Sequence, residues 1–372
     1  MRVLLAGGGT AGHINPALAI AAKIKQKQPD AEILFAGTQR GMEARLIPKA
    51  GYAFTPIDVR GFQRQFSWHN LGNNLLAVHC LAKSQVQARR ILREFKPDVV
   101  IGTGGYVSGP IVLQAARRGI KTLIHEQNAY AGVTTKLLSR YVDEALLAVE
   151  DAAKYLHNGC RYTVVGNPIR EEVIFADRKA AREKYKVGDR ICLLSFGGSL
   201  GARRVNDAVA ELMKHLYRTD RFFHIHATGS LEKDTFAQTL KELGVKENAN
   251  LCIREYIDDM PDCIAAADLM ITRAGAITLS EIEAAGKASV LIPSPNVAEN
   301  HQYHNAMVLS RADAAVVIEE KDLTGESLCT AVDRLTQDTS TLRWLGKNAS
   351  KLAVVDCADR IYEEILRVLG QK

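Results

Sequence analysis

The residue types best suited to chemistry stand at the start of the chain, in a glycine-rich loop that ends in a histidine. The apolar residues 3–6 lead into the glycines of residues 7–12, and Pro16 then opens a helical pattern. This order predicts a strand, a tight loop and a helix. Glycines let a ligand approach the backbone, and the free N–H groups at a helix start favour an anion such as a phosphate. His13 is the one side chain of the loop that exchanges a proton near neutral pH, so it is the candidate base.

Two later glycine loops have the same surroundings as the first. Residues 102–106 follow the apolar run 99–101, and residues 197–201 follow the apolar run 191–195. The second of these loops repeats the Gly-Gly-hydroxyl-x-Gly order of residues 8–12. A single such loop is compatible with a purely structural turn. Because open α/β sheets bind ligands where their strands end, repeated loops at these positions predict a site for a nucleotide-linked substrate.

Strand patterns and helical patterns alternate along the whole chain, which is typical of parallel sheets covered on both faces. The 372 residues are too many for one ordinary core. The alternation breaks at residues 166–170 and then starts again, so this segment is the expected hinge. We therefore predict an α/β fold with two Rossmann-like, doubly wound parallel-sheet domains facing a cleft. The first comprises residues 1–165, and the second begins at residue 166.

Composition and charge exclude several classes of protein. Hydrophobic residues make up 47% and charged residues 24% of the chain, as in an ordinary soluble protein. The net charge of +6 permits an anionic ligand or membrane surface, but no basic run is interleaved with aromatic residues, so no nucleic-acid partner is expected. Seven cysteines without a C-x-x-C pair indicate reduced thiols of a cytoplasmic protein and no zinc site. No apolar stretch approaches the roughly 18 residues that a membrane span needs.

Two spacings bear on cofactors and metals. Gly7-x-Gly9-x-x-Gly12 fits the dinucleotide fingerprint, but the second expected strand ends in Thr38 instead of the acidic residue that would hold a ribose. A dinucleotide-dependent oxidoreductase therefore stays an alternative. No two aspartates are separated by a single residue, so the metal-holding D-x-D element of many sugar-nucleotide transferases is absent. We expect no metal site and no tightly bound cofactor, and the effect of a divalent cation is left open.

The second half of the chain carries residues that could balance the charge of a diphosphate without a metal. These are Ser199, the helix start after Gly201, and the cation Arg170. Thr278 and Glu281 allow two interpretations. Their spacing fits a capping box, and Glu281 could equally accept hydrogen bonds from ribose hydroxyls.

Residues 62–92 combine apolar and basic side chains. Aromatic and leucine side chains alternate there with Arg64, Lys83, Arg89 and other cations, as in a surface that lies on an anionic membrane. An amphipathic helix packed on the sheet would explain the later half equally well. The predicted membrane patch consists of Phe62, Phe66, Trp68 and Leu75.

Five segments, residues 8–16, 104–110, 197–202, 276–281 and 301–306, together resemble the MurG family of peptidoglycan N-acetylglucosaminyltransferases along nearly the whole chain. The resemblance implies a GT-B fold and an inverting transfer of N-acetylglucosamine from UDP-N-acetylglucosamine. The acceptor would be the muramyl 4-hydroxyl of undecaprenyl-pyrophosphoryl-MurNAc-pentapeptide (lipid I), and the product lipid II. Such an enzyme would be peripheral, at the cytoplasmic face of the cell membrane, on its anionic inner surface.

The resemblance also implies where particular residues act. The family's last helix crosses back to the first domain, so residues 342–372 are expected there, and residues 166–341 would bind the UDP-sugar. An acceptor-side loop would consist of Gly104, Gly105 and Tyr106. The donor contacts would be Thr10, Ala11, Gly12, Asn128, Arg170, Ser199, Ile257, Ala276, Ile277, Thr278, Leu279, Ser280, Glu281 and Gln302. Ile257 would meet the uracil through its backbone, Glu281 the ribose, and Gln302 the sugar hydroxyls.

Two positions depart from the family's pattern. Ala11 stands where the family often has glycine, and His301 stands where a glutamine often precedes Gln302. Two other classes of function also stay open. A UDP-N-acetylglucosamine 2-epimerase shares the two-domain plan and would form the manno sugar from the donor alone. A catalytically silent membrane adaptor would bind UDP weakly or not at all.

Overall fold

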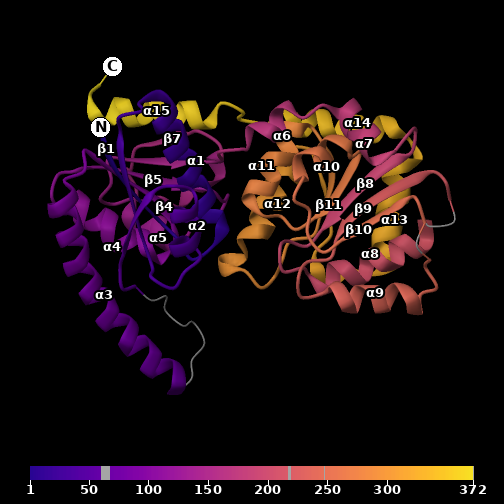
Figure 1. Ribbon diagram of the computed structural model, residues 1–372, viewed down its shortest axis with the longest axis horizontal. Coiled ribbons are helices and arrows are strands. Elements are labelled where there is room, and N and C mark those ends of the chain that lie inside the picture. The colour runs from indigo at the N-terminus through magenta and orange to yellow at the C-terminus, as the bar shows by residue number, and fades with distance from the viewer. Residues whose placement is uncertain (60–67, 217–218, 247, 372) are drawn as a thin grey trace. The chain divides into compact units, whose positions relative to one another are not determined.

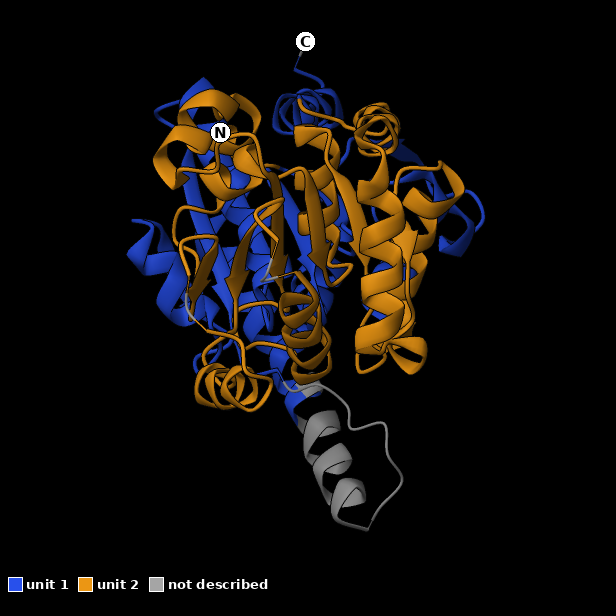
Figure 2. Cartoon of the chain, turned by 90° about the vertical axis from the view of Figure 1, so that its right-hand side faces the viewer, with its two compact units in different colours: residues 1–168, 356–372 blue, residues 169–355 orange. Residues whose placement is uncertain are grey.

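The structure is a computed structural model that describes residues 1–59, 68–216, 219–246 and 248–371, with only the backbone of residues 68–79 and 81. The chain forms two compact units (Figure 2). Unit 1 contains Met1–Pro168 and Asp356–Lys372, and unit 2 contains Ile169–Val355. The first division falls within the expected hinge, so the break in the sequence pattern marks a real boundary between cores.

Unit 1 is built on a parallel sheet with the strand order β3-β2-β1-β4-β5-β6-β7 (Figure 1). The strands are β1 (Arg2–Gly7), β2 (Glu32–Gly37), β3 (Ala53–Pro56), β4 (Val99–Gly104), β5 (Lys121–Glu126), β6 (Glu144–Leu147) and β7 (Tyr162–Val164). The helices are α1 (Ala11–Lys27), α2 (Glu43–Lys49), α3 (Trp68–Phe95), α4 (Gly105–Ala116), α5 (Val133–Leu138), the 3-10 helix η1 (Glu150–Tyr155) and α15 (Cys357–Leu369). Because β1 lies between β2 and β4, the order reverses beside β1, and this is the point at which such sheets bind ligands.

Unit 2 repeats this plan with the order β10-β9-β8-β11-β12-β13. Its strands are β8 (Ile191–Phe196), β9 (Phe222–Ala227), β10 (Leu251–Arg254), β11 (Leu269–Thr272), β12 (Ala288–Leu291) and β13 (Val316–Val317). Its helices are α6 (Glu171–Phe175), α7 (Arg178–Tyr185), α8 (Arg203–Leu216), α9 (Lys233–Glu242), α10 (Met260–Ala266), α11 (Ala276–Ala285), η2 (Ala298–Asn300), α12 (His301–Arg311), η3 (Glu320–Asp322), α13 (Gly325–Gln337) and α14 (Thr339–Ser350). The prediction of two doubly wound parallel-sheet domains is confirmed.

The central strands explain why each unit folds around its sheet. All six residues of β8 are buried, as are Val3, Leu4 and Leu5 of β1. Leu5 pairs with Phe35 of β2 on one side and with Ile101 of β4 on the other. Strands with apolar side chains on both faces are stable only between two layers of helices, and burying each such side chain contributes about 1.5–3 kcal/mol.

The chain returns to unit 1 later than the sequence predicts. We expected residues 342–372 to pack on the first domain, but the return begins at Asp356. Leu342 and Leu345 of α14 belong to the core of unit 2, and a Cβ on Gly346 would lie 2.3 Å from the carbonyl oxygen of Gly286. This close approach of backbones keeps α14 on unit 2.

The last helix, α15, is held to unit 1 by ion pairs as well as by its apolar face. Lys23 and Lys27 of α1 both contact the carboxylate of Asp359 at 3.0 Å. Arg367 near the end of α15 pairs with the buried Glu144 of β6. The chain's last helix thus lies beside its first (Figure 1), which ties the two ends of the sequence into one core.

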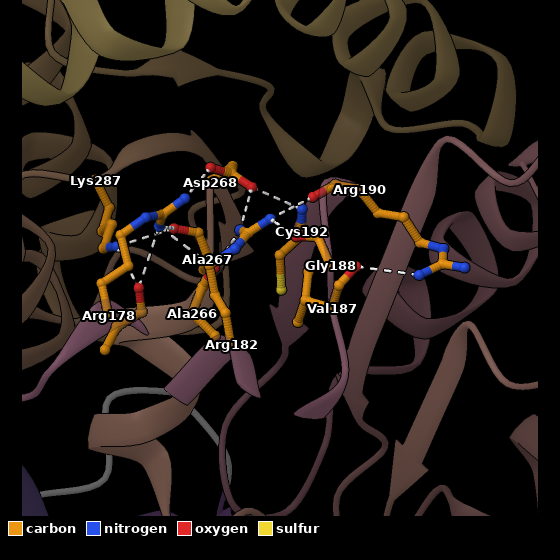
Figure 3. Close-up of polar contacts among 11 residues, drawn as sticks. Arg178, Arg182, Val187, Gly188, Arg190, Cys192, Ala266, Ala267, Asp268 and Lys287 are labelled. Carbon is orange, nitrogen blue, oxygen red and sulfur yellow. Dashed lines mark hydrogen bonds and ion pairs between the residues drawn. The ribbon is translucent and has the colours of Figure 1, made fainter. Parts of the chain in front are cut away.

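A cluster of cations holds the C-terminal end of α10 (Figure 3). Arg178 and Arg182 donate hydrogen bonds to the carbonyl oxygens of residues 265–267 and to the carboxylate of Asp268. The buried Lys287 donates to two of the same carbonyls at 2.9 Å, and burial lowers the pKa of its ammonium group to about 8. Cations at a helix C-terminus satisfy its free carbonyls and complement its dipole. The cluster therefore fixes α10, which begins just after the predicted uracil-contacting segment.

Candidate functional site

His13 lies in the first turn of α1, with its imidazole turned back toward the loop that follows β1. Its Nδ1 atom is 3.1 Å from the carbonyl oxygen of Gly8 and 3.2 Å from the hydroxyl of Thr10. A carbonyl oxygen only accepts hydrogen bonds, so this contact assigns the proton of the neutral ring to Nδ1. The Nε2 atom is then the acceptor, which is the state that a general base needs.

The predicted acceptor-side loop encloses the same imidazole. Gly104 and Gly105 have φ angles of +107° and +76°, which disfavour any side chain. A Cβ on Gly104 would lie 2.7 Å from Cδ2 of His13, and a Cβ on Gly105 would lie 2.3 Å from the carbonyl oxygen of Gly8. Thr103 donates from its hydroxyl to the carbonyl oxygen of His13 at 2.8 Å. The loops after β1 and β4 therefore form one site around His13.

Glu43, at the start of α2, completes this site and was not predicted from the sequence. Its side chain is fully buried, with Oε2 accepting from the N–H of Gly9 at 3.2 Å. Its Oε1 accepts from the N–H and the hydroxyl of Thr38 at 2.9 and 2.6 Å. Burial acts to raise the pKa of this carboxyl, but the hydrogen bonds outweigh it and the pKa lies below its usual value.

The position of Glu43 decides what the first glycine loop can bind. A Cβ on Gly8 or Gly41 would lie 2.6 or 2.4 Å from its carboxylate, so the glycines close around it. The chain's own anion thus takes the N–H of Gly9, one of the donors that a dinucleotide-binding loop would offer, and its charge would repel a phosphate beside it. This arrangement opposes the oxidoreductase alternative. The sequence signal for this role was weak: Glu43 is an acidic residue, but it stands five positions after Thr38, too far along the chain to fit the dinucleotide pattern.

The glycine loop after β8 keeps three of its N–H groups free of acceptors among the described residues. Ser199 and Leu200 are exposed, and the N–H groups of residues 198–200 donate to no acceptor in the described part of the chain. Gly198 and Gly201 have φ angles of +103° and +90°. The carbonyl oxygens of Ser199 and Leu200 accept from residues 230 and 231 at 3.2 Å, which supports the loop from behind. With α8 beginning at Arg203, this loop has free donors suited to a diphosphate.

Arg170 and Glu281 are brought together in unit 2. Arg170 donates from Nη2 and Nε to Oε1 of Glu281, at 2.7 and 3.1 Å. Both contacts use Oε1, so Oε2 has no donor among the described residues. Burial raises the pKa of the Glu281 carboxyl by more than Arg170 lowers it. The capping-box interpretation is wrong, because α11 begins at Ala276 after the N-cap Gly275 and Thr278 already lies inside the helix.

The remaining predicted donor residues of unit 2 are placed as follows. The side chain of Ile257 is buried in the core, so only its backbone is available to a ligand. Gln302 is the second residue of α12 and accepts from the N–H of Ser294 at 2.9 Å through Oε1, which leaves its amide N–H groups for another partner. Asn305 of the same helix donates to the carbonyl of Ala274 at 3.2 Å. This bond places the start of α11, with residues 276–281, beside α12.

Four predicted donor residues belong to unit 1. Thr10 and Gly12 are exposed at the start of α1, and Ala11 between them is the first helical residue. Ala11 is not among the residues with positive φ, so alanine fits this position without strain. Asn128 donates from its backbone N–H and its side chain to Glu126, both at 3.1 Å. The donor contacts of these residues stay predictions.

Two predictions, the membrane patch and the absence of a metal or cofactor, are not tested by the structure. Phe62 and Phe66 lie outside the described residues, and so do the side chains of Trp68 and Leu75, so the predicted membrane patch is not tested. In the described part of the chain, no three histidine, cysteine, aspartate or glutamate side chains are grouped as metal ligands. The expectation about metals and cofactors stays a prediction.

Known proteins match the chain over almost its full length. Residues 3–147 match the Glycosyltransferase family 28 N-terminal domain, and residues 192–361 match the Glycosyltransferase family 28 C-terminal domain. The UDP-N-acetylglucosamine--N-acetylmuramyl-(pentapeptide) pyrophosphoryl-undecaprenol N-acetylglucosamine transferase of Acetivibrio thermocellus is 45% identical over 373 residues, covering 100% of this chain and 99% of the relative. The protein of the same name from Ruminiclostridium cellulolyticum is 44% identical over 370 residues, covering 99% of this chain and 100% of that one.

A solved structure agrees with these sequence relatives. The crystal structure of MurG from Acinetobacter baumannii matches with a TM-score of 0.80 and 29% identity, covering 98% of this chain and 99% of that one. Identity above 40% along the full length of both proteins leaves no segment of the chain that belongs to another family. The chain belongs to the MurG family of N-acetylglucosaminyltransferases, within glycosyltransferase family 28.

Proposed function

We propose that this chain transfers N-acetylglucosamine from UDP-N-acetylglucosamine to the muramyl 4-hydroxyl of lipid I, with inversion at the anomeric carbon. The product is lipid II, the precursor used in peptidoglycan synthesis. The observation that carries this proposal is that each unit offers one part of the chemistry: unit 1 holds a histidine whose ring is oriented as a base, and unit 2 holds a glycine loop with N–H groups that, among the described residues, are free for an anion. The relatives that are 44–45% identical carry the name of this transferase, which argues against an epimerase, and a silent adaptor would need no oriented base.

The reaction is a single displacement. The acceptor hydroxyl attacks the anomeric carbon while Nε2 of His13 takes its proton, and the bond from that carbon to the diphosphate oxygen of UDP breaks. The Nδ1–H group of His13 remains on the Gly8 carbonyl, which holds the ring in orientation and stabilises the imidazolium that forms. Gly104 and Gly105 keep the space beside the ring free of side chains.

Unit 2 binds the donor and stabilises the leaving group. The N–H groups of residues 198–200 and the hydroxyl of Ser199 meet the diphosphate, together with Arg170. Glu281 accepts from the ribose hydroxyls through its free Oε2, and the backbone of Ile257 meets the uracil. Arg170 is half exposed and already bonded to Glu281, so its guanidinium can turn from the carboxylate to the diphosphate without crossing a packed core.

The decisive experiment is transfer of radiolabel from UDP-N-acetylglucosamine to a lipid-linked muramyl acceptor. Label is expected in the lipid fraction only when the acceptor is present, and equally with and without a chelator. Product analysis with the donor alone separates the alternatives, because the manno sugar would identify an epimerase. Calorimetric titration with UDP tests the adaptor, and absence of binding would favour it.

The enzyme also has a described surface suited to an anionic membrane. No helix in the described residues combines the length and apolarity needed to cross a bilayer. Val133, Leu137 and Tyr141 nevertheless expose between 50% and 59% of their area along α5 and its end, with Lys136 and Arg140 among them. We propose that this face lies on the cytoplasmic surface of the cell membrane, where apolar side chains enter the headgroup region and cations meet anionic lipids.

Vesicle sedimentation tests the membrane proposal. Leu137→Asp is expected to reduce binding to anionic vesicles, and neutral vesicles should bind the wild-type chain less. The control is Leu231→Asp, because Leu231 is a leucine of unit 2 that is even more exposed than Leu137, at 72% against 59%. Unchanged binding of Leu137→Asp, or an equal loss in the control, would contradict the assignment of α5.

A further inference from the structure

We infer that Glu43 is a positioning residue for His13 and acts through the peptide group that joins Gly8 to Gly9. This inference rests on the proposed role of His13 as the base. Glu43 acts at a distance from the reacting atoms, since the hydrogen bonds to its buried carboxylate come from Gly9, Thr38 and its own backbone N–H. Its effect would be to hold the Gly8 carbonyl in the direction that fixes the proton of His13 on Nδ1.

The two hydrogen bonds that carry the inference use the two opposite edges of one planar peptide group. The N–H of Gly9 donates to Oε2 of Glu43 at 3.2 Å, and the carbonyl oxygen of Gly8 lies 3.1 Å from Nδ1 of His13. These N–H and C=O groups belong to the same conjugated amide. A carboxylate on the N–H side polarises the amide and makes its oxygen a stronger acceptor, as in other hydrogen-bonded chains. The Glu43 carboxylate, the peptide group between Gly8 and Gly9, and the His13 imidazole therefore form one continuous hydrogen-bonded chain.

The glycines explain why a positioning residue is needed. Gly8 and Gly9 have no side chains to resist rotation of their shared peptide group, and Gly9 already adopts a φ of +84°. A flipped peptide would present its N–H to Nδ1 of His13. The neutral ring would then carry its proton on Nε2, the atom that must accept the proton of the sugar hydroxyl. The carboxylate selects against this flip because it accepts hydrogen bonds and cannot donate one.

The enclosure of Glu43 shows that its charge is built into the site. Thr38 supplies two donors to Oε1, and Gly9 supplies one to Oε2, so the buried charge is hydrogen-bonded on both oxygens. A buried carboxylate is tolerated only with such partners. Gly37 and Gly41 leave the room it occupies, since a Cβ on either would lie 2.5 or 2.4 Å from the Glu43 side chain.

The test replaces the carboxylate with an amide of the same shape, Glu43→Gln. The amide has one oxygen, which keeps two hydrogen bonds if it faces Thr38 and one if it faces Gly9, so its NH₂ group is expected to face the N–H of Gly9, and that hydrogen bond is lost. Nitrogen NMR of histidine-labelled protein without substrates reads the tautomer, and the His13 signals are assigned by their loss in His13→Gln. We expect the Nδ1–H form in the wild type and a shift toward Nε2–H in Glu43→Gln. The turnover number should fall about 100-fold, and the Kd for UDP should change less than about twofold.

A second carboxylate of unit 1 provides the matched control. Asp143 accepts from the N–H and the hydroxyl of Thr122 at 2.8 and 3.0 Å, as Glu43 does from Thr38, but has no bond to the first loop. Asp143→Asn should leave the tautomer and the turnover number unchanged. Thr38→Val keeps the carboxylate and its bond to Gly9, so it should keep the Nδ1–H form even if turnover drops slightly.

Several outcomes would overturn the inference. An Nε2–H ring in the wild type would do so without any variant, and so remains decisive if Glu43→Gln fails to fold. An unchanged tautomer in a folded Glu43→Gln, or the same shift in Asp143→Asn, would show that Glu43 only stabilises the fold. Because the tautomer is read without substrates, these results are independent of whether the wild-type chain transfers N-acetylglucosamine.

Discussion

The glycine loop after β1 and the glycine loop after β8 follow the central strands of two similar sheets, and both share the order Gly-Gly-hydroxyl-x-Gly. In the first, the N–H of Gly9 donates to the buried carboxylate of Glu43. In the second, the N–H groups of residues 198–200 donate to nothing in the described part of the chain. In the first loop the protein itself supplies a carboxylate to one N–H group, whereas in the second the three N–H groups are, among the described residues, free for an anionic ligand.

The difference comes from residues outside both loops. α2 delivers Glu43 to the first loop from a position 34 residues further along the chain. Near the second loop's sheet, the hinge delivers Arg170, a cation, to Glu281 of α11. In the proposed mechanism, the same backbone pattern thus serves proton transfer in one unit and leaving-group binding in the other. Each prediction below would break or sharpen this division.

The largest effect is expected from His13→Gln. The amide keeps a polar side chain of similar length but cannot accept the hydroxyl proton, and a positioned base typically contributes about 10²- to 10⁴-fold to turnover. The turnover number should fall by that factor, and calorimetry should give a Kd for UDP close to the wild-type value, because the diphosphate site belongs to unit 2. Near-normal turnover would show that His13 is not the base.

The next largest effect is a difference in stability between the alanine variants of Gly201 and Gly198, two glycines of the loop after β8. A Cβ on Gly201 would lie 2.4 Å from the carbonyl oxygen of Thr228, whereas a Cβ on Gly198 would have no atom within 4 Å. Both have positive φ, which costs an alanine about 1–2 kcal/mol. Gly201→Ala should add a backbone clash and cost about 3 kcal/mol in denaturant unfolding. Equal losses in the two variants would mean that the loop is free to shift, contrary to a preformed anion site.

Glu281→Gln tests donor binding by unit 2. Hydrogen bonds to a charged group contribute about 1.5–3 kcal/mol, so the Kd for UDP should rise about 10- to 100-fold. Glu283 on the same helix provides the control, because burial raises its pKa to about 8 and it is protonated at neutral pH. Glu283→Gln should leave the Kd unchanged. A similar loss in both variants would assign the effect to the packing of α11.

The two buried carboxylates should also respond to pH with opposite signs. The folded pKa of Glu43 is lowered, because its hydrogen bonds outweigh burial, so its stabilisation is present above the unfolded pKa and lost as pH falls through the folded one. The folded pKa of Glu281 is raised by burial, so stability falls as pH rises from the unfolded pKa through the folded one. With both unfolded pKa values near 4.5, the unfolding free energy relative to wild type should fall as pH rises toward that value for Glu43→Gln, and it should rise with pH above that value for Glu281→Gln. Slopes of the same sign would contradict this distinction.

Local sequence patterns predicted the strands and glycine loops of the site, but not the side chain that completes it. Apolar runs ending in glycines gave β1, β4 and β8 and their loops, because buried parallel strands and tight turns leave strong signals in sequence. Arg170 and Glu281 were also predicted, although their ion pair was not. Glu43 was missed because its role depends on where α2 packs, and contacts of that kind have no local pattern.

The start of α11 and the packing of the last helices of the chain were harder to predict for a similar reason. The capping-box interpretation of Thr278 failed because the helix start is set one turn earlier, at Gly275, by the turn after β11. The return to unit 1 was placed too early because the family resemblance implied only that the last helix crosses back, and α14, which precedes that helix, could cover either sheet. A close approach of Gly346 to Gly286 decides that choice, and such an approach is visible only in three dimensions.

The smallest effect is expected from Ala11→Gly, which restores the residue that the family often has in the first loop. Ala11 is the first helical residue of α1 and does not have positive φ, so glycine brings no relief of strain there. It instead adds conformational freedom to the unfolded chain and to the helix start, at a cost of about 0.5–1 kcal/mol. Denaturant unfolding should therefore show a small loss, with Ala17→Gly in the buried face of α1 as a control that loses more. A gain in stability would mean that the loop before α1 is strained by its alanine, and the comparison between a filled, rigid first loop and an open second loop would need revision.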